Sequence, residues 1–196
     1  MGTQNEAVRA VAPWANSLEP VAEGGPVPDV QLAGREPDPH DVARQIVLRQ
    51  LAMAPRSRAQ LAQKLSQCGC PADVAAAVLD RMTEVGLVDD QAYAQMLVRS
   101  QQAGRGLAKR ALARELRTKG IGEHQAEEAL ASISDEDERD RAGALVDKKL
   151  RAMHGLAIPV QTRRLAGMLA RKGYPSSVTY AVIRDAIAEA PEHLPD

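Results

Sequence analysis

The sequence predicts an all-helical protein built from three tandem three-helix repeats. Aromatic residues make up only 2% of the chain and Phe is absent, so the core depends on Leu, Val, Ile, Met and Ala, a mixture that favours helix over sheet. Apolar residues recur at helical spacing from about residue 41, one pattern occurs three times, and no segment alternates like a strand. Because so small a unit buries little surface alone, we expect the repeats to pack in an elongated, curved array.

Residues 1–40 are expected to form a disordered, acidic N-terminal tail. They contain six of the twelve prolines and six acidic residues against two basic ones, with little apolar periodicity. The ordered body is therefore expected to begin near residue 41, with repeats at 41–88, 89–133 and 134–196, the last including a short C-terminal tail.

Three segments that align without a gap define the repeat; they begin at Arg58, Lys109 and Thr162. Each has two leucines four residues apart, which places both on one face of a helix. A glycine follows in each segment and is expected to end that helix in the left-handed conformation. The aligned positions are Leu61, Leu112 and Leu165; Leu65, Leu116 and Leu169; and Gly69, Gly120 and Gly173.

In the first repeat, a helix is expected at 41–53 and a second from about Arg58. Ser57 followed by Gln60 forms a capping-box pattern at the start of the second helix. Pro71, like Pro175 in the third repeat, suits the first turn of the following helix. Cys70 is expected to pack as a small apolar side chain rather than to serve a redox role.

The second and third repeats are expected to begin with helices at 91–103 and 137–153. Asp89 and Asp90 favour capping over metal binding, and the AGRG stretch from Ala103 is expected to be a loop leading into a basic helix. The acidic run Asp135 to Glu138 is interpreted as a solvated helix start. A longer connection is expected from Met153 to Val160.

Charge is segregated along the body of the chain. Residues 99–119 hold seven basic residues and one acidic residue, residues 148–172 hold seven basic residues and no acidic one, and residues 123–140 hold eight acidic residues and one basic one. This pattern favours a polyanion or an acidic partner, although a charged run is often only the solvated face of a helix. Arg110, Arg114 and Arg117 follow i, i+4, i+7 spacing and are expected to point outward together.

Several functions are disfavoured by what the sequence lacks. It shows no membrane-span or secretory-signal pattern, which makes a cytoplasmic location the expectation. It also shows no phosphate loop, nucleophile elbow or metal-ligand spacing, so we expect no enzyme activity, cofactor or metal site. Tyr93, Tyr174 and Tyr180 are expected to fill cores or repeat interfaces, which argues against a stacking platform for single strands.

The stretches RSRAQLAQKL from Arg56, GLVDDQAYA from Gly86 and LARELRTKGI from Leu112 resemble the RecX family of bacterial regulatory proteins. The resemblance implies tandem three-helix units and a modulator, usually an inhibitor, of the recombinase RecA, which coats single-stranded DNA. It implies binding in the groove of the RecA filament, which would hinder filament growth, ATP hydrolysis and strand exchange.

The resemblance also implies roles for particular residues. Asp89, Asp90 and Tyr93 are expected to form the repeat junction that shapes the middle unit. The expected partner-binding face, with possible direct contact to DNA, comprises Arg99, Arg105, Lys109, Arg110, Arg114, Arg117 and Lys119, extended in the third repeat by Arg163, Arg164, Arg171 and Lys172.

Two other function classes stay open at this stage. Three-helix units with short turns also resemble helix-turn-helix transcription regulators, which would require a defined operator and, most often, a symmetric dimer. An enzyme is the least favoured class because the chain lacks a recognisable catalytic constellation.

Overall fold

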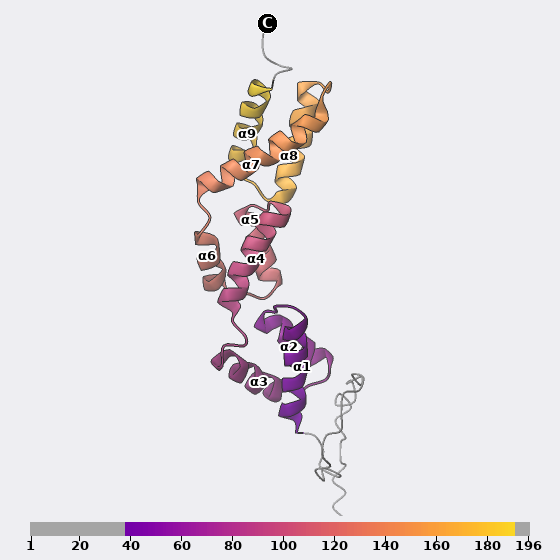
Figure 1. The fold of residues 1–196 in the computed structure, drawn as a ribbon, viewed down its shortest axis with the longest axis vertical. Coiled ribbons are helices and arrows are strands. Elements are labelled where there is room, and N and C mark those ends of the chain that lie inside the picture. The colour runs from indigo at the N-terminus through magenta and orange to yellow at the C-terminus, as the bar shows by residue number, and fades with distance from the viewer. Residues whose placement is uncertain (1–37, 191–196) are drawn as a thin grey trace, which may run out of the picture. The chain divides into compact units, whose positions relative to one another are not determined.

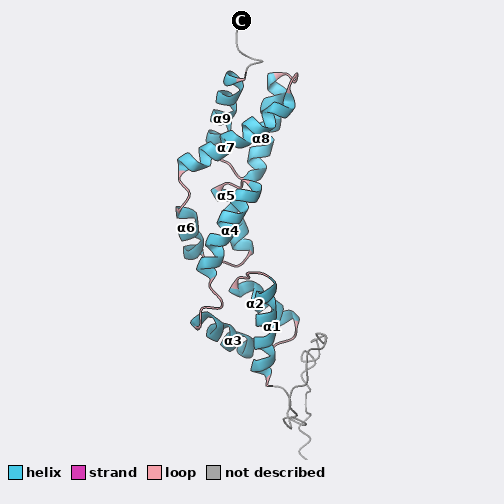
Figure 2. Ribbon diagram, in the orientation of Figure 1, coloured by secondary structure: helices cyan, strands magenta, loops and turns pink. Residues whose placement is uncertain are grey.

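The computed structural model describes residues 38–190 of the chain. Throughout this part the secondary structure consists only of helices joined by loops (Figure 2), and the helices form three successive three-helix domains, which confirms the predicted all-helical repeat fold. The chain divides into two compact units, one ending at Val88 and the other beginning at Asp89. No helix in the described ranges is both long and apolar enough to span a membrane.

The first domain contains α1 (Pro39–Met53), α2 (Arg58–Gln67) and α3 (Ala72–Glu84), all labelled in Figure 1. Its core includes Leu61, Leu65 and Leu79, each at most 2% exposed. The predicted capping box is present, because the amide of Gln60 donates to the Ser57 hydroxyl and the Ser57 amide donates to the Gln60 side chain.

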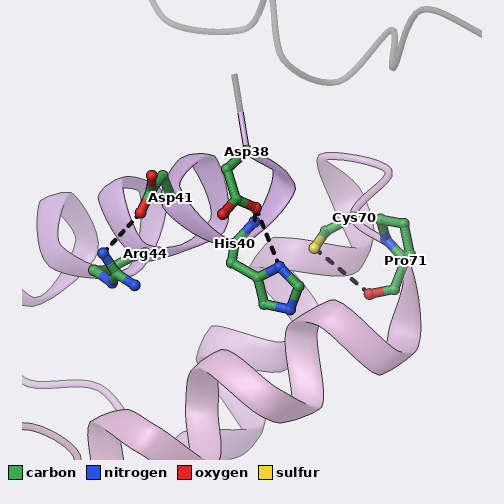
Figure 3. A network of polar contacts seen from close by, with 6 residues as sticks. All are labelled: Asp38, His40, Asp41, Arg44, Cys70 and Pro71. Carbon is green, nitrogen blue, oxygen red and sulfur yellow. Dashed lines mark hydrogen bonds and ion pairs between the residues drawn. The ribbon is translucent and has the colours of Figure 1, made fainter. Parts of the chain in front are cut away.

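Polar contacts lie at the start of helix α1 (Figure 3). The His40 amide donates to Asp38 Oδ1 at 2.9 Å, and this hydrogen bond lowers the pKa of the Asp38 carboxyl. Helix α1 therefore starts at Pro39, so residues 39 and 40 are helical rather than part of the predicted tail. Asp38, also part of the predicted tail, is the N-cap of α1, and residues 1–37 of that prediction lie outside the described range.

Cys70 is buried beside the end of α2, and its thiol lies 3.6 Å from the Pro71 carbonyl oxygen (Figure 3). Burial raises the pKa of this thiol. This environment confirms that Cys70 packs as an apolar side chain. Pro71 lies at the N-cap of α3 instead of in its first turn, and Pro175 has the same place before α9 (Ser176–Glu189).

The second domain contains α4 (Asp90–Arg105), α5 (Lys109–Thr118) and α6 (Glu123–Ala131). The Ala92 amide donates to Asp89 Oδ1 at 2.9 Å, as expected of a capping Asp. The expected loop at Ala103 is wrong for its first three residues. Helix α4 continues through Arg105 because Gly106, with φ of 58°, is the glycine that adopts the left-handed cap.

The third domain contains α7 (Asp135–Leu150), a short 3-10 helix (Arg151–Met153), α8 (Ile158–Lys172) and α9. Helix α8 starts at Ile158, so the expected long connection from Met153 to Val160 is wrong. Pro159 lies in the first turn of α8, where a missing amide hydrogen breaks no helical hydrogen bond. The Leu pairs of all three repeats are at most 1% exposed, and the three aligned glycines have positive φ.

Candidate nucleic-acid and partner interface

The second and third domains are held together by hydrogen bonds near the start of α5. The Ala108 amide donates to the Lys172 carbonyl at 3.0 Å, and the Tyr174 hydroxyl donates to the Gly106 carbonyl at 3.1 Å. The Lys109 amide donates to Glu138 Oε1 at 2.8 Å. We call these contacts the joint.

Glu138 is the acidic residue of the joint, and the prediction that it belongs to a solvated run is wrong. It is 7% exposed, whereas Asp135, Glu136 and Asp137 are exposed. The reason lies in α5, whose N-cap is Ala108 and has no side-chain acceptor. Glu138 supplies the missing acceptor from α7, and its negative charge is favourable at the positive end of the α5 dipole.

Three of the predicted binding cations make contacts within the chain. Arg105 Nη1 lies 3.3 Å from Glu115 Oε2, and Lys109 Nζ lies 3.2 Å from Asp135 Oδ1. The ammonium group of Lys172 donates to the Arg105 carbonyl. These side chains therefore contribute to the structure around the joint.

Arg110 and Arg114 lie in a different setting, on the wall of a cleft of about 510 Å³. Both are exposed, and neither forms an ion pair with any residue from 38 to 190. The opposite walls come from α8, α9 and the turn between them. We call this site the arginine cleft; its other lining residues are Ala166, Gly167, Ala170, Gly173, Tyr174, Ser176, Thr179 and Tyr180.

The structure does not bring all predicted cations to this cleft. Arg117 lines a separate pocket with Glu123 and Glu127 of α6. Lys119 is half-buried at the C-cap of α5. Exposed cations that do not line the arginine cleft are Arg99 on α4 and Arg163, Arg164 and Arg171 on α8. A Cβ built at Gly167 would lie 3.4 Å from Arg171 Nη1, which places that guanidinium against a residue of the cleft wall.

Matches to known proteins follow the same domain order. Models of the first, second and third three-helix domains of RecX match residues 43–82, 89–130 and 135–183. A regulatory protein RecX from Streptomyces coelicolor is 46% identical over 185 residues, covering 91% of this chain and 98% of the relative. The chain belongs to the RecX family.

A further relative agrees with this assignment, and two solved structures share the fold. The regulatory protein RecX of Thermobifida fusca is 46% identical over 145 residues, covering 74% of this chain and 78% of that relative. The crystal structure of RecX from Lactobacillus salivarius has a TM-score of 0.69 at 19% identity, and it matches 76% of this chain and 96% of the solved one. A second regulatory protein RecX crystal structure has a TM-score of 0.68 at 27% identity, covering 76% and 74%.

In this RecX-family chain, the residues predicted to shape the middle unit lie at the start of α4. Asp89 caps the helix, Asp90 is its first residue, and Tyr93 is 8% exposed within the core of the second domain. Tyr174 is also buried, as predicted, and burial raises its pKa to about 12. The prediction for Tyr180 is wrong, because this side chain is 59% exposed.

Sequence reasoning missed the α9 side of the cleft, where Ser176, Thr179 and Tyr180 lie. Thr179 is 3% exposed, and its Oγ1 has no hydrogen-bond partner among the described residues. The available sequence signal was the absence of acidic residues from the first turn of α9. The same feature occurs in α2, α5 and α8, so it does not single out α9, and only the fold shows that two arginines line a cleft with the start of this helix.

Proposed function

We propose that this chain binds RecA and its filament on single-stranded DNA, and thereby inhibits recombinase, ATPase and strand-exchange activity. In this role the protein modulates DNA recombination and repair without catalysis of its own. The observation that carries the proposal is the exposed arginine pair, Arg110 and Arg114, which has no intramolecular ion pair in the described part of the chain. Family membership supports the choice of RecA as the partner.

The arginines act by attraction to a negatively charged filament. Guanidinium groups form paired hydrogen bonds to phosphate or carboxylate oxygens, so either DNA or an acidic protein surface satisfies them. Arg163 and Arg164 add exposed positive charge on α8, and phosphate contacts by such residues weaken as salt rises. A bound regulator would then oppose movements of RecA protomers that accompany turnover.

The test is the DNA-dependent ATPase rate of the cognate RecA on single-stranded DNA while the protein is titrated in. Wild-type protein is expected to lower the rate at substoichiometric amounts. The variant Arg110→Glu/Arg114→Glu/Arg117→Glu is expected to lose most of that effect while keeping its helicity by circular dichroism.

The matched control reverses three exposed arginines of the first domain, as Arg44→Glu/Arg49→Glu/Arg81→Glu, and is expected to inhibit like wild type. An unchanged ATPase rate at stoichiometric excess of wild-type protein would contradict the proposal. A footprint on one specific duplex sequence would instead favour the helix-turn-helix regulator.

A further inference from the structure

We propose that the arginine cleft is a binding subsite for a phosphate ester, with Tyr180 as a stacking surface for the attached base. The inference rests on the proposed function in one respect, since it takes Arg110 and Arg114 as part of the binding face. It goes further by naming the ligand chemistry and by adding residues of α9 to the site. Its test needs no RecA.

The first argument is the charge of the cleft. Two arginines from α5 line it, and none of its lining residues is acidic. Two carboxylates of the same compact unit lie outside the cleft lining: Glu138 accepts a hydrogen bond from the Lys109 amide, and Glu115 pairs with Arg105. The cleft therefore keeps a positive potential that nothing on its walls neutralises.

The second argument is the N-terminus of α9. This helix spans 14 residues, has no side-chain cap at Pro175 and carries no acidic residue in its first turn. Its first residue, Ser176, lines the cleft. The amides and dipole at such an end favour an anion, and here they share a cleft with the two guanidinium groups.

The third argument is the Thr179 hydroxyl. It is buried on the cleft wall without a hydrogen-bond partner among residues 38–190. The carbonyl four residues earlier, at Pro175, accepts the Thr179 amide at 2.9 Å. Buried hydroxyls are normally paired, so an unpaired one beside two arginines indicates a ligand oxygen as its partner.

The shape of the cleft distinguishes a phosphate ester from a small carboxylate. Its α8 wall consists of the small residues Ala166, Gly167 and Ala170, and the Arg171 guanidinium lies against Gly167 at the edge of this wall. The volume of about 510 Å³ exceeds that of one phosphate and accommodates an attached sugar and base. Tyr180 lies on the same lining and is 59% exposed, which leaves its ring available for stacking.

The experiment measures binding of the full chain to fluorescently labelled oligothymidylate by anisotropy at low salt. Arg110→Gln/Arg114→Gln is expected to weaken the affinity at least roughly tenfold, because each lost charged hydrogen bond is worth more than a neutral one. Thr179→Val keeps the shape of the buried side chain and is expected to weaken binding about threefold. Tyr180→Ala is expected to weaken it roughly tenfold through lost stacking.

The matched control is Arg44→Gln/Arg81→Gln, which removes the same charge from exposed positions of the first domain and is expected to bind like wild type. Wild-type affinity in both the arginine and the Thr179 variants would overturn the subsite. If those variants bind oligothymidylate normally yet fail to inhibit RecA, the cleft recognises an acidic protein surface; the proposed function then stands and the phosphate inference fails.

Two sources of the phosphate are separated with fluorescent ATP as a second probe. Each assignment requires that Arg110→Gln/Arg114→Gln bind the probe more weakly than wild type does. Binding of oligothymidylate alone assigns the subsite to the nucleic-acid backbone. Binding of ATP that competes with oligothymidylate assigns it to a nucleotide.

Discussion

The joint and the arginine cleft lie side by side around α5 and show two different uses of positive charge. At the joint, Arg105 and Lys109 face carboxylates, and Lys172 donates to a carbonyl. In the cleft, Arg110 and Arg114 have no such partner in the described part of the chain. Basic residues that are close in sequence therefore have two different roles, intramolecular contacts and availability for a partner. Counting charges along the sequence does not distinguish these roles.

This comparison predicts that joint variants lose stability while cleft variants lose binding. The largest effect on stability is expected for Gly173→Ala. Gly173 lies between the joint residues Lys172 and Tyr174 and also lines the arginine cleft, so this variant is used only to measure stability. Gly173 has φ of +90°, and a Cβ there would lie 2.7 Å from both the nitrogen and the Cβ of Ala111. Left-handed backbone costs roughly 1–2 kcal/mol for a residue with a side chain. Overpacking adds about 1–3 kcal/mol. Urea unfolding followed by circular dichroism measures the sum.

Gly155→Ala is the matched control for that substitution. Gly155 has φ of +77°, lies in the same compact unit, and has open space around the position of a Cβ. Gly155→Ala is expected to lower the free energy of unfolding only by the cost of the left-handed backbone, which is roughly 1–2 kcal/mol. Equal losses in the two variants would show that the approach of Gly173 to Ala111 adds nothing to stability.

The next effect in size is expected for Glu138→Ala. This change removes the acceptor of the Lys109 amide at the start of α5 and should lower the free energy of unfolding by about 1–3 kcal/mol. Glu138→Gln keeps an acceptor oxygen and should lose less, whereas Glu136→Ala, at an exposed position, should change stability by less than about 0.5 kcal/mol.

The same variant sharpens the comparison with the cleft. Folded Glu138→Ala protein should bind oligothymidylate at least as tightly as wild type, because a negative charge has been removed next to a basic surface. Binding weaker than that of wild type by the folded variant would contradict the division between joint and cleft.

The sequence was sufficient for features that depend on neighbouring residues. Leucines four residues apart, Gly120 at a helix end, and caps such as Ser57 and Asp89 each act within one or two turns, so their pattern is visible in the chain. The burial of Glu138 was not predictable in this way, because Glu138 accepts a hydrogen bond from the Lys109 amide, which lies 29 residues away in the sequence.

The candidate site was predictable only on its α5 side. Helical spacing is enough to place Arg110 and Arg114 on one face, but Ser176, Thr179 and Tyr180 reach the cleft through the packing of the third domain. Tyr180 is expected from the sequence to fill a core or a repeat interface, whereas its position on α9 leaves it 59% exposed. Tertiary packing, which no local pattern encodes, decides these positions.

The smallest effect, and the one with a distinct pH signature, is expected for Tyr174→Phe. The change removes the hydrogen bond to the Gly106 carbonyl and should lower stability by about 0.5–1.5 kcal/mol at neutral pH. Burial raises the pKa of Tyr174 from 10.0 to about 12, so the unfolded chain releases this proton at lower pH than the folded protein does. The stability that the neutral hydroxyl contributes is therefore complete below pH 10 and is lost as pH rises through about 12.

Urea unfolding of the wild-type and Tyr174→Phe proteins across this pH range should show that the greater stability of wild type shrinks as pH rises. Lysines and the other tyrosines titrate equally in both proteins, so they do not affect the difference. A difference that stays constant would mean that Tyr174 titrates alike in the folded and unfolded chain, which would contradict the raised pKa that its burial causes.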